Sequence, residues 1–343
     1  MKKNNICPKC GEAATLIKEK KQEEFRKEKF EITEHYYYCD KCKEEYEPDY
    51  FIDLNLNQIY NQYREKYNIL FPEQIKKIRE QYKLIPTKMS RILGFGDNVY
   101  RSYENGEVPS LSNAMVLKST IDPGKFENMV KEGYAIYKDD LFSRNEYEEL
   151  LKIINKQKED KEKEKDFADF IQDKFNRATS TSGYKIFNLN KYAYMVVYFL
   201  ENYGNSFKTY INKFLFYSDF LNYKSTGYSI SGSEYIAMQK GPVPDFFDIY
   251  YELMKQKDVF AVEEFENENG VFECMKKNMK FNPEYFNKEE LDNLENSVKF
   301  FSDLKPISKI VDISHEEKAW KDNVGTKQKI DYQKYAFEMR ELK

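Results

Sequence analysis

The sequence predicts a mainly α-helical protein of several domains, with a small β-rich part at its N-terminus. Three observations support this fold class. Aromatic residues make up 16% of the 343 residues, whereas glycine (13) and proline (10) fall below their usual shares of roughly 7% and 5%. Apolar residues recur at helical spacing through most of the chain. Four of the five cysteines precede the first of these helical stretches, in a region rich in turn and strand signals.

Charge and hydropathy narrow the class of protein further. The formal net charge is −4, from 55 Lys and Arg against 59 Asp and Glu, so any contact with nucleic acid or membrane must be local. The longest apolar run, Tyr192–Leu200, is far shorter than the ~20 residues of a membrane-spanning helix. The first five residues lead into a cysteine pair and not into an apolar segment, which argues against a signal peptide. We therefore expect a soluble, cytoplasmic protein without a membrane partner.

Residues 1–55 carry two Cys-x-x-Cys pairs, Cys7/Cys10 and Cys39/Cys42. In a reducing cytoplasm this pattern indicates a metal site and not a disulfide framework. Four thiolates from two tight turns close a tetrahedral site of the kind that zinc prefers, and such a closed site is structural. We predict a zinc ribbon that holds Zn²⁺. The alternatives are a redox pair or thiols without a role. His35 is a competing candidate ligand, but four cysteines already suffice.

The spacing of the two pairs is unusual. The 28 residues between them exceed the usual ~15–20. We therefore expect the charged stretch Lys18–Lys29 to extend as a hairpin or arm.

Residues 68–135 predict three short helices followed by further helical segments. The first helix begins near Pro72, the second ends at Gly94, and the third closes at Asn105-Gly106. The segments M-S-R-I-L-G-F and V-Y-R-S-Y-E-N-G-E-V-P-S resemble the helix-turn-helix DNA-binding domain of the Cro and phage-repressor class. A cysteine ribbon placed before such a domain is further similar to MqsA-type antitoxins.

The resemblance implies operator DNA as a partner, bound by a homodimer. A recognition helix presents hydrogen-bonding side chains to base edges and cations to phosphates, and residues 70–120 carry a local charge of +3. The residues expected to contact DNA are Lys88, Arg91, Asn98, Tyr100, Arg101 and Ser102. Those expected to pack the domain are Ile92, Leu93, Val99 and Tyr103.

Pro86 departs from the pattern of this class. Many members begin the second helix with a glutamine that contacts phosphate, and Pro86 stands at the matching position. Proline has no side-chain donor. The alternative is therefore a degenerate module that serves only in protein contacts or dimerisation.

Residues 136–183 are expected to connect the two halves of the chain. Helical spacing from Asn145 predicts a long helix, and mixed-sign charge over Lys156–Asp166 indicates a solvated face or tether. Small polar residues over Asn176–Gly183 predict a linker.

Residues 184–343 begin with two aromatic, amphipathic helices, Asn190–Tyr203 and Phe207–Tyr223. Alternation over Ile230–Ala237 predicts a short strand, and Val259–Cys274 predicts a hairpin. The segments K-F-L-F-Y-S-D-F-L, G-Y-S-I-S-G-S-E-Y-I-A, G-P-V-P and S-H-E-E-K-A-W follow in this order. Together they resemble the Panacea domain, also known as the SocA-like domain. This resemblance implies an antitoxin that neutralises a protein toxin by direct binding.

Single residues of this region allow plainer interpretations. Asp219, among aromatic neighbours, is expected to be satisfied by a hydrogen-bond donor. His315 and Trp320 are five residues apart, so we expect them not to share a helix face, and we expect His315 to be packed and hydrogen-bonded.

The motifs of common enzymes are missing from the sequence. The chain has two histidines, and His315-Glu316 fails as a zincin motif because Ala319 stands where the second histidine belongs. Gly94-Phe95-Gly96 lacks the third glycine of a dinucleotide loop, and there is no P-loop. We expect no enzyme and no catalytic residue.

We thus predict an antitoxin that binds its toxin through residues 184–343 and represses its own operon through residues 68–135. The sequence singles out no residue for toxin contact. The alternative is a transcription regulator of a prophage or mobile element without a toxin partner. A small, growth-inhibiting product of the adjacent open reading frame would favour the antitoxin, and its absence would favour the regulator.

Overall fold

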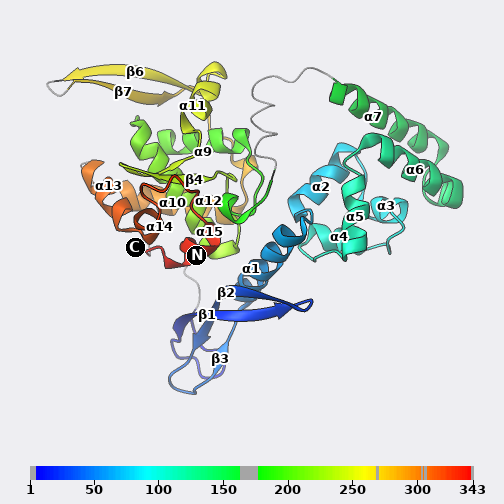
Figure 1. Cartoon of the computed structure of the whole chain (residues 1–343), viewed down its shortest axis with the longest axis horizontal. Coiled ribbons are helices and arrows are strands. Elements are labelled where there is room, and N and C mark those ends of the chain that lie inside the picture. Colours follow the sequence, from blue (N-terminus) through cyan, green and yellow to red (C-terminus); the bar gives the residue numbers. More distant parts are fainter. Residues whose placement is uncertain (1–4, 163–176, 268–269, 303, 305–306, 341–343) are drawn as a thin grey trace. The chain divides into compact units, whose positions relative to one another are not determined.

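The computed structural model describes residues 5–162, 177–267, 270–302, 304 and 307–340 (Figure 1). This part of the chain is mainly helical and carries three small antiparallel sheets, which confirms the predicted fold class. The chain divides into two compact units, one of Met1–Ile59 with Phe167–Lys343 and one of Tyr60–Asp166. Among the described residues, none of the helices combines the length and the apolar character that a membrane span requires.

The N-terminal ribbon, residues 5–46, is built on a long hairpin of β1 (Thr15–Phe25) and β2 (Glu28–Tyr38). Arg26 and Lys27 form its two-residue turn, both with positive φ, as a hairpin with the right-handed twist of its strands requires. A short strand β3 (Glu45–Tyr46) pairs with the end of β2. The hairpin contains the stretch that was expected to form an arm, and so confirms that prediction.

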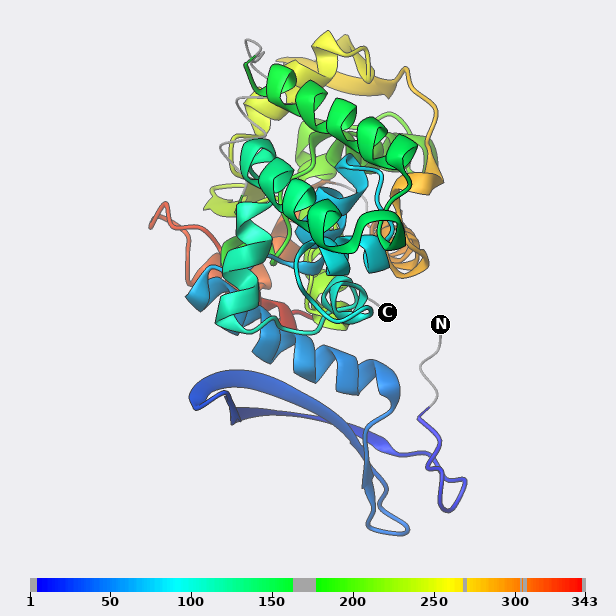
Figure 2. The ribbon, with the colours of Figure 1, turned by 90° about the vertical axis from the view of Figure 1, so that its right-hand side faces the viewer.

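The second edge of β2 is covered by a helix and not by another long strand. Helix α1 (Asp49–Tyr67) runs beside the hairpin (Figure 2). The side chain of Gln58 accepts a hydrogen bond from the Thr33 N–H (2.8 Å) and donates one to the Thr33 carbonyl (2.9 Å). Asn55 makes the same pair of bonds to His35 (3.0 Å each). Two side-chain amides thus satisfy backbone groups that would otherwise need a strand partner.

The ribbon and α1 also contact the C-terminal region. Gln333 donates to Gln58 Oε1 (3.1 Å) and accepts from the Tyr223 hydroxyl (2.7 Å). The ring of His35 lies 5.1 Å from that of Phe337. The compact units therefore group the chain differently from the expected division into residues 1–55, 68–135, 136–183 and 184–343, because the ribbon packs with the C-terminal region.

Residues 60–166 form the helical unit. A cap supplied by Ser110 or Asp122 begins α5 and α6, and Gly94, with φ +70°, follows the end of α3. Its core is a single cluster that includes Ile75, Tyr100 and Phe126. The helices are α2 (Pro72–Gln81), α3 (Pro86–Ile92), α4 (Val99–Glu104), α5 (Leu111–Ser119), α6 (Pro123–Tyr137), the 3₁₀ turn η1 (Lys138–Asp140) and α7 (Arg144–Glu162).

Residues 136–183, which were expected to connect the two halves of the chain, are partly packed into the structure. Helix α7 corresponds to the predicted long helix, whose continuation over 163–176 lies outside the described residues. The expected linker is instead packed: η2 (Ser180–Ser182) has Ser182 buried, and Gly183, with φ +61°, lies against Ser229. The small hydroxyl side chains donate to groups of the C-terminal region, as Ser180 does to Asp331 (2.8 Å).

The C-terminal region is arranged around α10 (Lys208–Thr226), which is buried over most of its length. The strands β4 (Tyr235–Met238) and β5 (Gly241–Pro244) form one hairpin, and β6 (Phe260–Asn267) and β7 (Gly270–Lys277) form another, close to the two predicted strand segments. The remaining elements are α9 (Leu189–Asn202), α11 (Phe247–Gln256), η3 (Pro283–Tyr285), α12 (Lys288–Ser302), α13 (Ile307–Glu316), α14 (Lys318–Lys321), α15 (Tyr332–Tyr335) and η4 (Ala336–Glu338).

Candidate functional site

The four cysteines of the ribbon lie on two turns with the same backbone geometry. The Gly11 N–H donates to the Cys7 carbonyl (2.9 Å), and the Lys43 N–H donates to the Cys39 carbonyl (2.8 Å). Gly11 and Lys43 both adopt positive φ, at +73° and +59°. Each turn therefore directs its two cysteine side chains to one side, as the doubled spacing in the sequence predicted.

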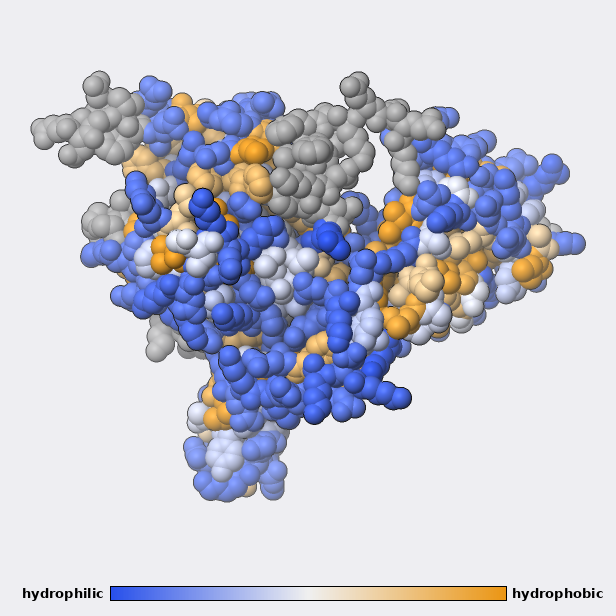
Figure 3. All heavy atoms as spheres, in the orientation of Figure 1, coloured by the Kyte–Doolittle hydropathy of each residue, from blue (hydrophilic) through white to orange (hydrophobic). Residues whose placement is uncertain are grey.

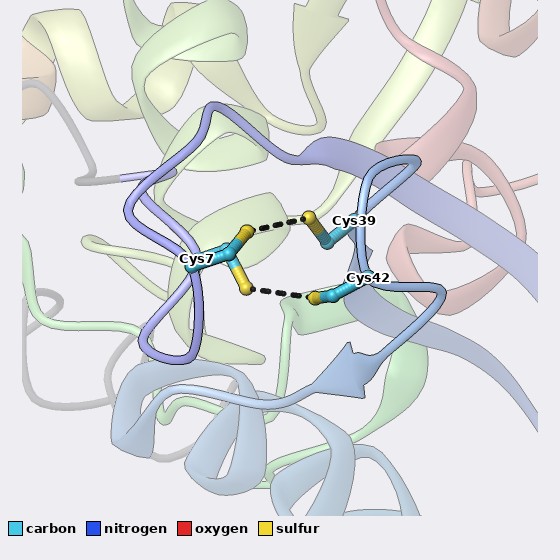
Figure 4. A group of neighbouring side chains, drawn as sticks. Cys7, Cys39 and Cys42 are labelled. Carbon is cyan, nitrogen blue, oxygen red and sulfur yellow. Dashed lines mark hydrogen bonds between the residues drawn. The ribbon is translucent and has the colours of Figure 1, made fainter.

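The sulfur atoms of the two turns meet (Figure 4). The Sγ atoms of Cys7 and Cys42 are 3.5 Å apart, those of Cys10 and Cys39 are 3.4 Å apart, and all four lie within 4.8 Å of one another. A tetrahedral zinc site with Zn–S bonds of about 2.3 Å has sulfur–sulfur edges of about 3.8 Å. The four thiols therefore match such a site in number, type and separation, and could bind a metal ion.

The competing ligand proposed for this centre is placed elsewhere. His35 is buried, its Nδ1 lies 2.8 Å from the Thr33 carbonyl oxygen, and its ring packs on Phe51 and Phe337. The candidate metal group contains the four cysteines without it. His35 therefore serves the packing of the ribbon against its neighbours.

The backbone already favours a thiolate within the cluster. The N–H of Cys42 lowers the pKa of Cys39 to about 6, whereas burial raises the pKa of Cys42 to about 12. A bound metal requires thiolates at all its cysteine ligands.

The helices α3 and α4 lie in the two segments for which the sequence predicts a second and a third short helix. The Tyr100 N–H donates to Ser90 Oγ (2.9 Å), and the Tyr100 hydroxyl donates to the Ile75 carbonyl (2.7 Å). Arg79 and Glu104 form a mostly buried ion pair between α2 and α4 (2.6 Å). These contacts fix α4 against α2 and α3.

Tyr100 was a candidate for DNA contact, and this prediction is wrong. Its side chain is fully buried, and both its hydroxyl and its backbone N–H are used inside the unit. The six-residue helix α4 turns this residue inward and its neighbours outward. Asn98 and Arg101 are exposed and Ser102 is half-buried. Arg101 has no ion pair within the described part of the chain.

The two other candidate cations carry ion pairs at the surface. Lys88 contacts Glu146 (2.6 Å), whose pKa it lowers to about 2, and Arg91 contacts Asp97 (2.9 Å). Exposed pairs of this kind contribute only about 0–1 kcal/mol. Pro86 is the first residue of α3, with Ile85 at the N-cap and no side-chain cap. The start of α3 therefore lacks the side-chain donor that a glutamine would supply.

The second recognisable set of residues, in the C-terminal region, lies inside the protein. Asp219 on α10 is fully buried and accepts four hydrogen bonds, which confirms the expectation that its neighbours satisfy it. The donors are Ile230 N–H (2.7 Å), Ser231 N–H (2.8 Å), Ser231 Oγ (2.5 Å) and the Tyr235 hydroxyl (2.8 Å). Burial raises the pKa of Asp219. This carboxyl group ties the segment after α10 to the central helix.

A buried lysine near the G-P-V-P segment was not predicted. Lys213 is fully buried, its Nζ donates to the Pro242 carbonyl (2.8 Å), and burial lowers its pKa to about 7. Gly241, with φ +96°, leaves no room for a Cβ because Lys213 and Ser314 lie against it. The K-F-L-F-Y-S-D and G-P-V-P segments thus meet as packing partners. The lysine itself gave no sign of this, because its contact lies far along the chain.

His315 and Trp320 lie on two different helices and so do not share a helix face, as expected, and their rings are nevertheless in contact. Helix α13 ends at Glu316 and α14 begins at Lys318, so the chain bends between the two residues. Their rings stack with centroids 3.8 Å apart and planes 16° apart. The Trp320 Nε1–H donates to the Met238 carbonyl (2.8 Å). His315 is packed as expected, but its buried Nε2 has no hydrogen-bond partner among the described residues.

The buried residues of the C-terminal region lie within a segment that matches a known family. Residues 211–321 match the family described as "Antitoxin SocA-like, Panacea domain". The match begins within α10 and ends at α14, and so includes Asp219, Lys213 and Trp320. No match was found among curated proteins or among solved structures.

Proposed function

We propose that this protein is an antitoxin that neutralises a protein toxin by direct binding through its C-terminal region. The match of residues 211–321 to the SocA-like Panacea domain carries the proposal, because that family is described as an antitoxin family. The buried Asp219 and Lys213 both lie within the matched residues, where they hold segments of the domain together. We propose no catalytic role for any residue.

The test is co-expression with the adjacent open reading frame. If the function is correct, expression of the neighbouring gene alone stops growth, the full chain restores growth, and the two proteins purify as one complex. A neighbour that is harmless, or that remains toxic beside the full chain, would contradict the proposal. That outcome would favour the second candidate, a regulator of a mobile element without a toxin partner, provided that the chain still binds its own promoter.

For the ribbon we propose a structural Zn²⁺ held by Cys7, Cys10, Cys39 and Cys42. The ion would cross-link the two turns, and it has no open coordination position for a substrate. Purified protein should contain about one zinc ion per chain, measured by elemental analysis. Cys39→Ser should lose the ion, whereas Cys274→Ser, outside the cluster, should retain it. Retention of zinc by Cys39→Ser would contradict this assignment.

For the helical unit we propose binding to operator DNA through the exposed residues around α4. Asn98, Arg101 and Ser102 are the residues proposed to reach base edges or phosphates, and Lys88 and Arg91 to reach phosphates. Autorepression follows if the operator overlaps the promoter of the chain's own gene. A footprint on an inverted repeat with half-sites about one helical turn apart would support it.

We further propose that the helical unit forms a homodimer. It exposes large apolar side chains, and residues of high hydropathy gather on the face of this unit seen in Figure 3. Met115 on α5 and Ile136 on α6 are 73% and 72% exposed. Large exposed apolar side chains favour self-association. Sedimentation of the full chain should give twice the monomer mass, and Met115→Asp should shift it toward the monomer.

A further inference from the structure

One surface of the C-terminal region brings a residue of the matched domain to the solvent. The turn between β4 and β5, helix α14 and the segment 322–329 form one edge, which we call the Trp320 edge. Trp320 donates to the Met238 carbonyl (2.8 Å) and accepts at its own carbonyl from the Val324 N–H (2.9 Å). A β-bridge between Ile236 and Lys329 closes the edge. Its surface residues are Met238, Lys240, Trp320, Lys321, Val324 and Lys327.

The apolar part of the Trp320 edge is exposed, and its tryptophan ring is held in one orientation. Met238 and Val324 are 47% and 39% exposed, and Trp320, the single tryptophan of the chain, is half-buried. The stack on His315 and the bond to Met238 hold the indole in one orientation. A side chain that is already fixed loses little conformational entropy on binding, and tryptophan is enriched among residues that dominate binding energy.

The charged part of the edge is basic, although the whole chain has a net charge of −4. Lys240, Lys321 and Lys327 are exposed, and none of them forms an ion pair within the described residues. Among the acids near the edge, Asp322 is exposed, and Asp331 accepts hydrogen bonds from the Ser180 hydroxyl and the Lys334 N–H. Glu316 pairs with Arg340, Glu234 with Lys329 and Glu338 with Lys318.

These observations point to an acidic partner. Unpaired lysines around an apolar centre are complementary to a surface on which carboxylates surround an apolar side chain. We propose that the Trp320 edge is where the toxin docks, and that the toxin places an apolar side chain against Trp320 and acidic side chains against the three lysines. This inference rests on the proposed antitoxin function.

The experiment measures the affinity of the full chain for the product of the adjacent open reading frame. Two variants test the edge: Met238→Asp, and the triple variant Lys240→Glu/Lys321→Glu/Lys327→Glu. The matched control for the triple variant is Lys257→Glu/Lys280→Glu/Lys288→Glu, which reverses three other exposed lysines of the same region. The control for Met238→Asp is Phe265→Asp, since Phe265 on β6 is 52% exposed.

Each variant of the edge should weaken binding at least about tenfold, whereas the controls should stay within about twofold of the wild type. The triple variant should also lose most of the salt dependence of the association rate. The unfolding temperature of every variant is measured, so that a folding defect is recognised. Trp320→Phe, which retains a stacking ring, gives a second test if Met238→Asp does not fold.

The outcomes separate the two proposals. If the wild-type chain does not bind the neighbouring gene product, the antitoxin function fails and the docking surface fails with it. If the wild type binds and the edge variants bind equally well, only the docking surface is wrong. Loss of binding in Phe265→Asp alone would place the toxin on the β6–β7 hairpin instead. Loss of DNA affinity in the triple variant, with toxin binding unchanged, would assign the lysines to nucleic acid.

Discussion

The helical unit and the C-terminal region use their recognisable residues in opposite ways. In the C-terminal region, Asp219 and Lys213 are fully buried and bind other parts of the same region. In the helical unit, Asn98 and Arg101 stand on the surface, while only Tyr100 of the expected set is inside. In the C-terminal region the recognisable residues stabilise the fold, whereas in the helical unit they are available for contact with a partner. Substitutions should therefore separate the two.

The largest effect is expected for Asp219→Ala. The variant leaves four buried hydrogen-bond donors without their acceptor, which should lower the free energy of unfolding by about 3–5 kcal/mol. Urea unfolding of the full chain measures it. Asp322→Ala, which removes an exposed carboxylate, should change stability by less than about 0.5 kcal/mol. Equal stability of the two variants would show that the buried carboxyl group is dispensable.

The next effect concerns Lys213 and depends on pH. Its pKa of about 7 in the folded protein lies below the ordinary value of 10.5. Between these values the unfolded chain binds a proton that the folded chain does not, so stability should rise with pH by up to about 1.4 kcal/mol per unit. Below pH 7 both states are protonated and this contribution is constant. Urea unfolding at pH 7, 8 and 9 should show a steeper rise for the wild type than for Lys213→Met; parallel curves would contradict the prediction.

Arg101→Ala tests whether the exposed residues of the helical unit contribute to DNA binding and not to stability. If Arg101 contacts the operator, its loss should cost about 1–3 kcal/mol in specific DNA binding. Its exposed position predicts a change in stability below about 0.5 kcal/mol. Fluorescence anisotropy with operator and random DNA measures the binding. Arg144→Ala, at an exposed arginine on α7, is the control, and equal losses in both variants would remove Arg101 from the interface.

The smallest effect is expected for Lys88→Ala. Lys88 must leave Glu146 before it can contact a phosphate, so its net contribution to DNA binding should be below about 1 kcal/mol. The loss should be the same for operator and random DNA, and the dependence of the binding constant on salt should fall by about one ion. A loss confined to the operator would instead make Lys88 a base-reading residue.

Local signals in the sequence predicted the elements well. Pro72 begins α2, as its missing N–H group favours, and Gly94 follows the end of α3. The spacing of Cys7/Cys10 and Cys39/Cys42 predicted the candidate metal centre, because each pair needs only its own turn to be placed. The mainly helical fold class followed from composition and spacing together.

Contacts between distant segments could not be predicted in this way. The inward orientation of Tyr100 depends on the docking of α4 against α2, and not on the six residues of α4. The bend at Glu317 that stacks His315 on Trp320 contains neither glycine nor proline. The burial of Lys213 could not be predicted, because the Pro242 carbonyl that accepts its hydrogen bond lies 29 residues further along the chain. For the same reason, the contact between Gln58 on α1 and Gln333 could not be predicted.

The hairpin of the ribbon has a consequence for association between chains. A strand edge with free backbone groups can recruit a strand from another molecule, and proteins prevent this by covering or charging the edge. β1 forms the outer edge of its sheet, and six of its eleven residues are Lys or Glu. On β2 the backbone of Thr33 and His35 is occupied by Gln58 and Asn55. The long arm is therefore protected from intermolecular strand addition on both sides, by charge along β1 and by the two amides of α1 along β2.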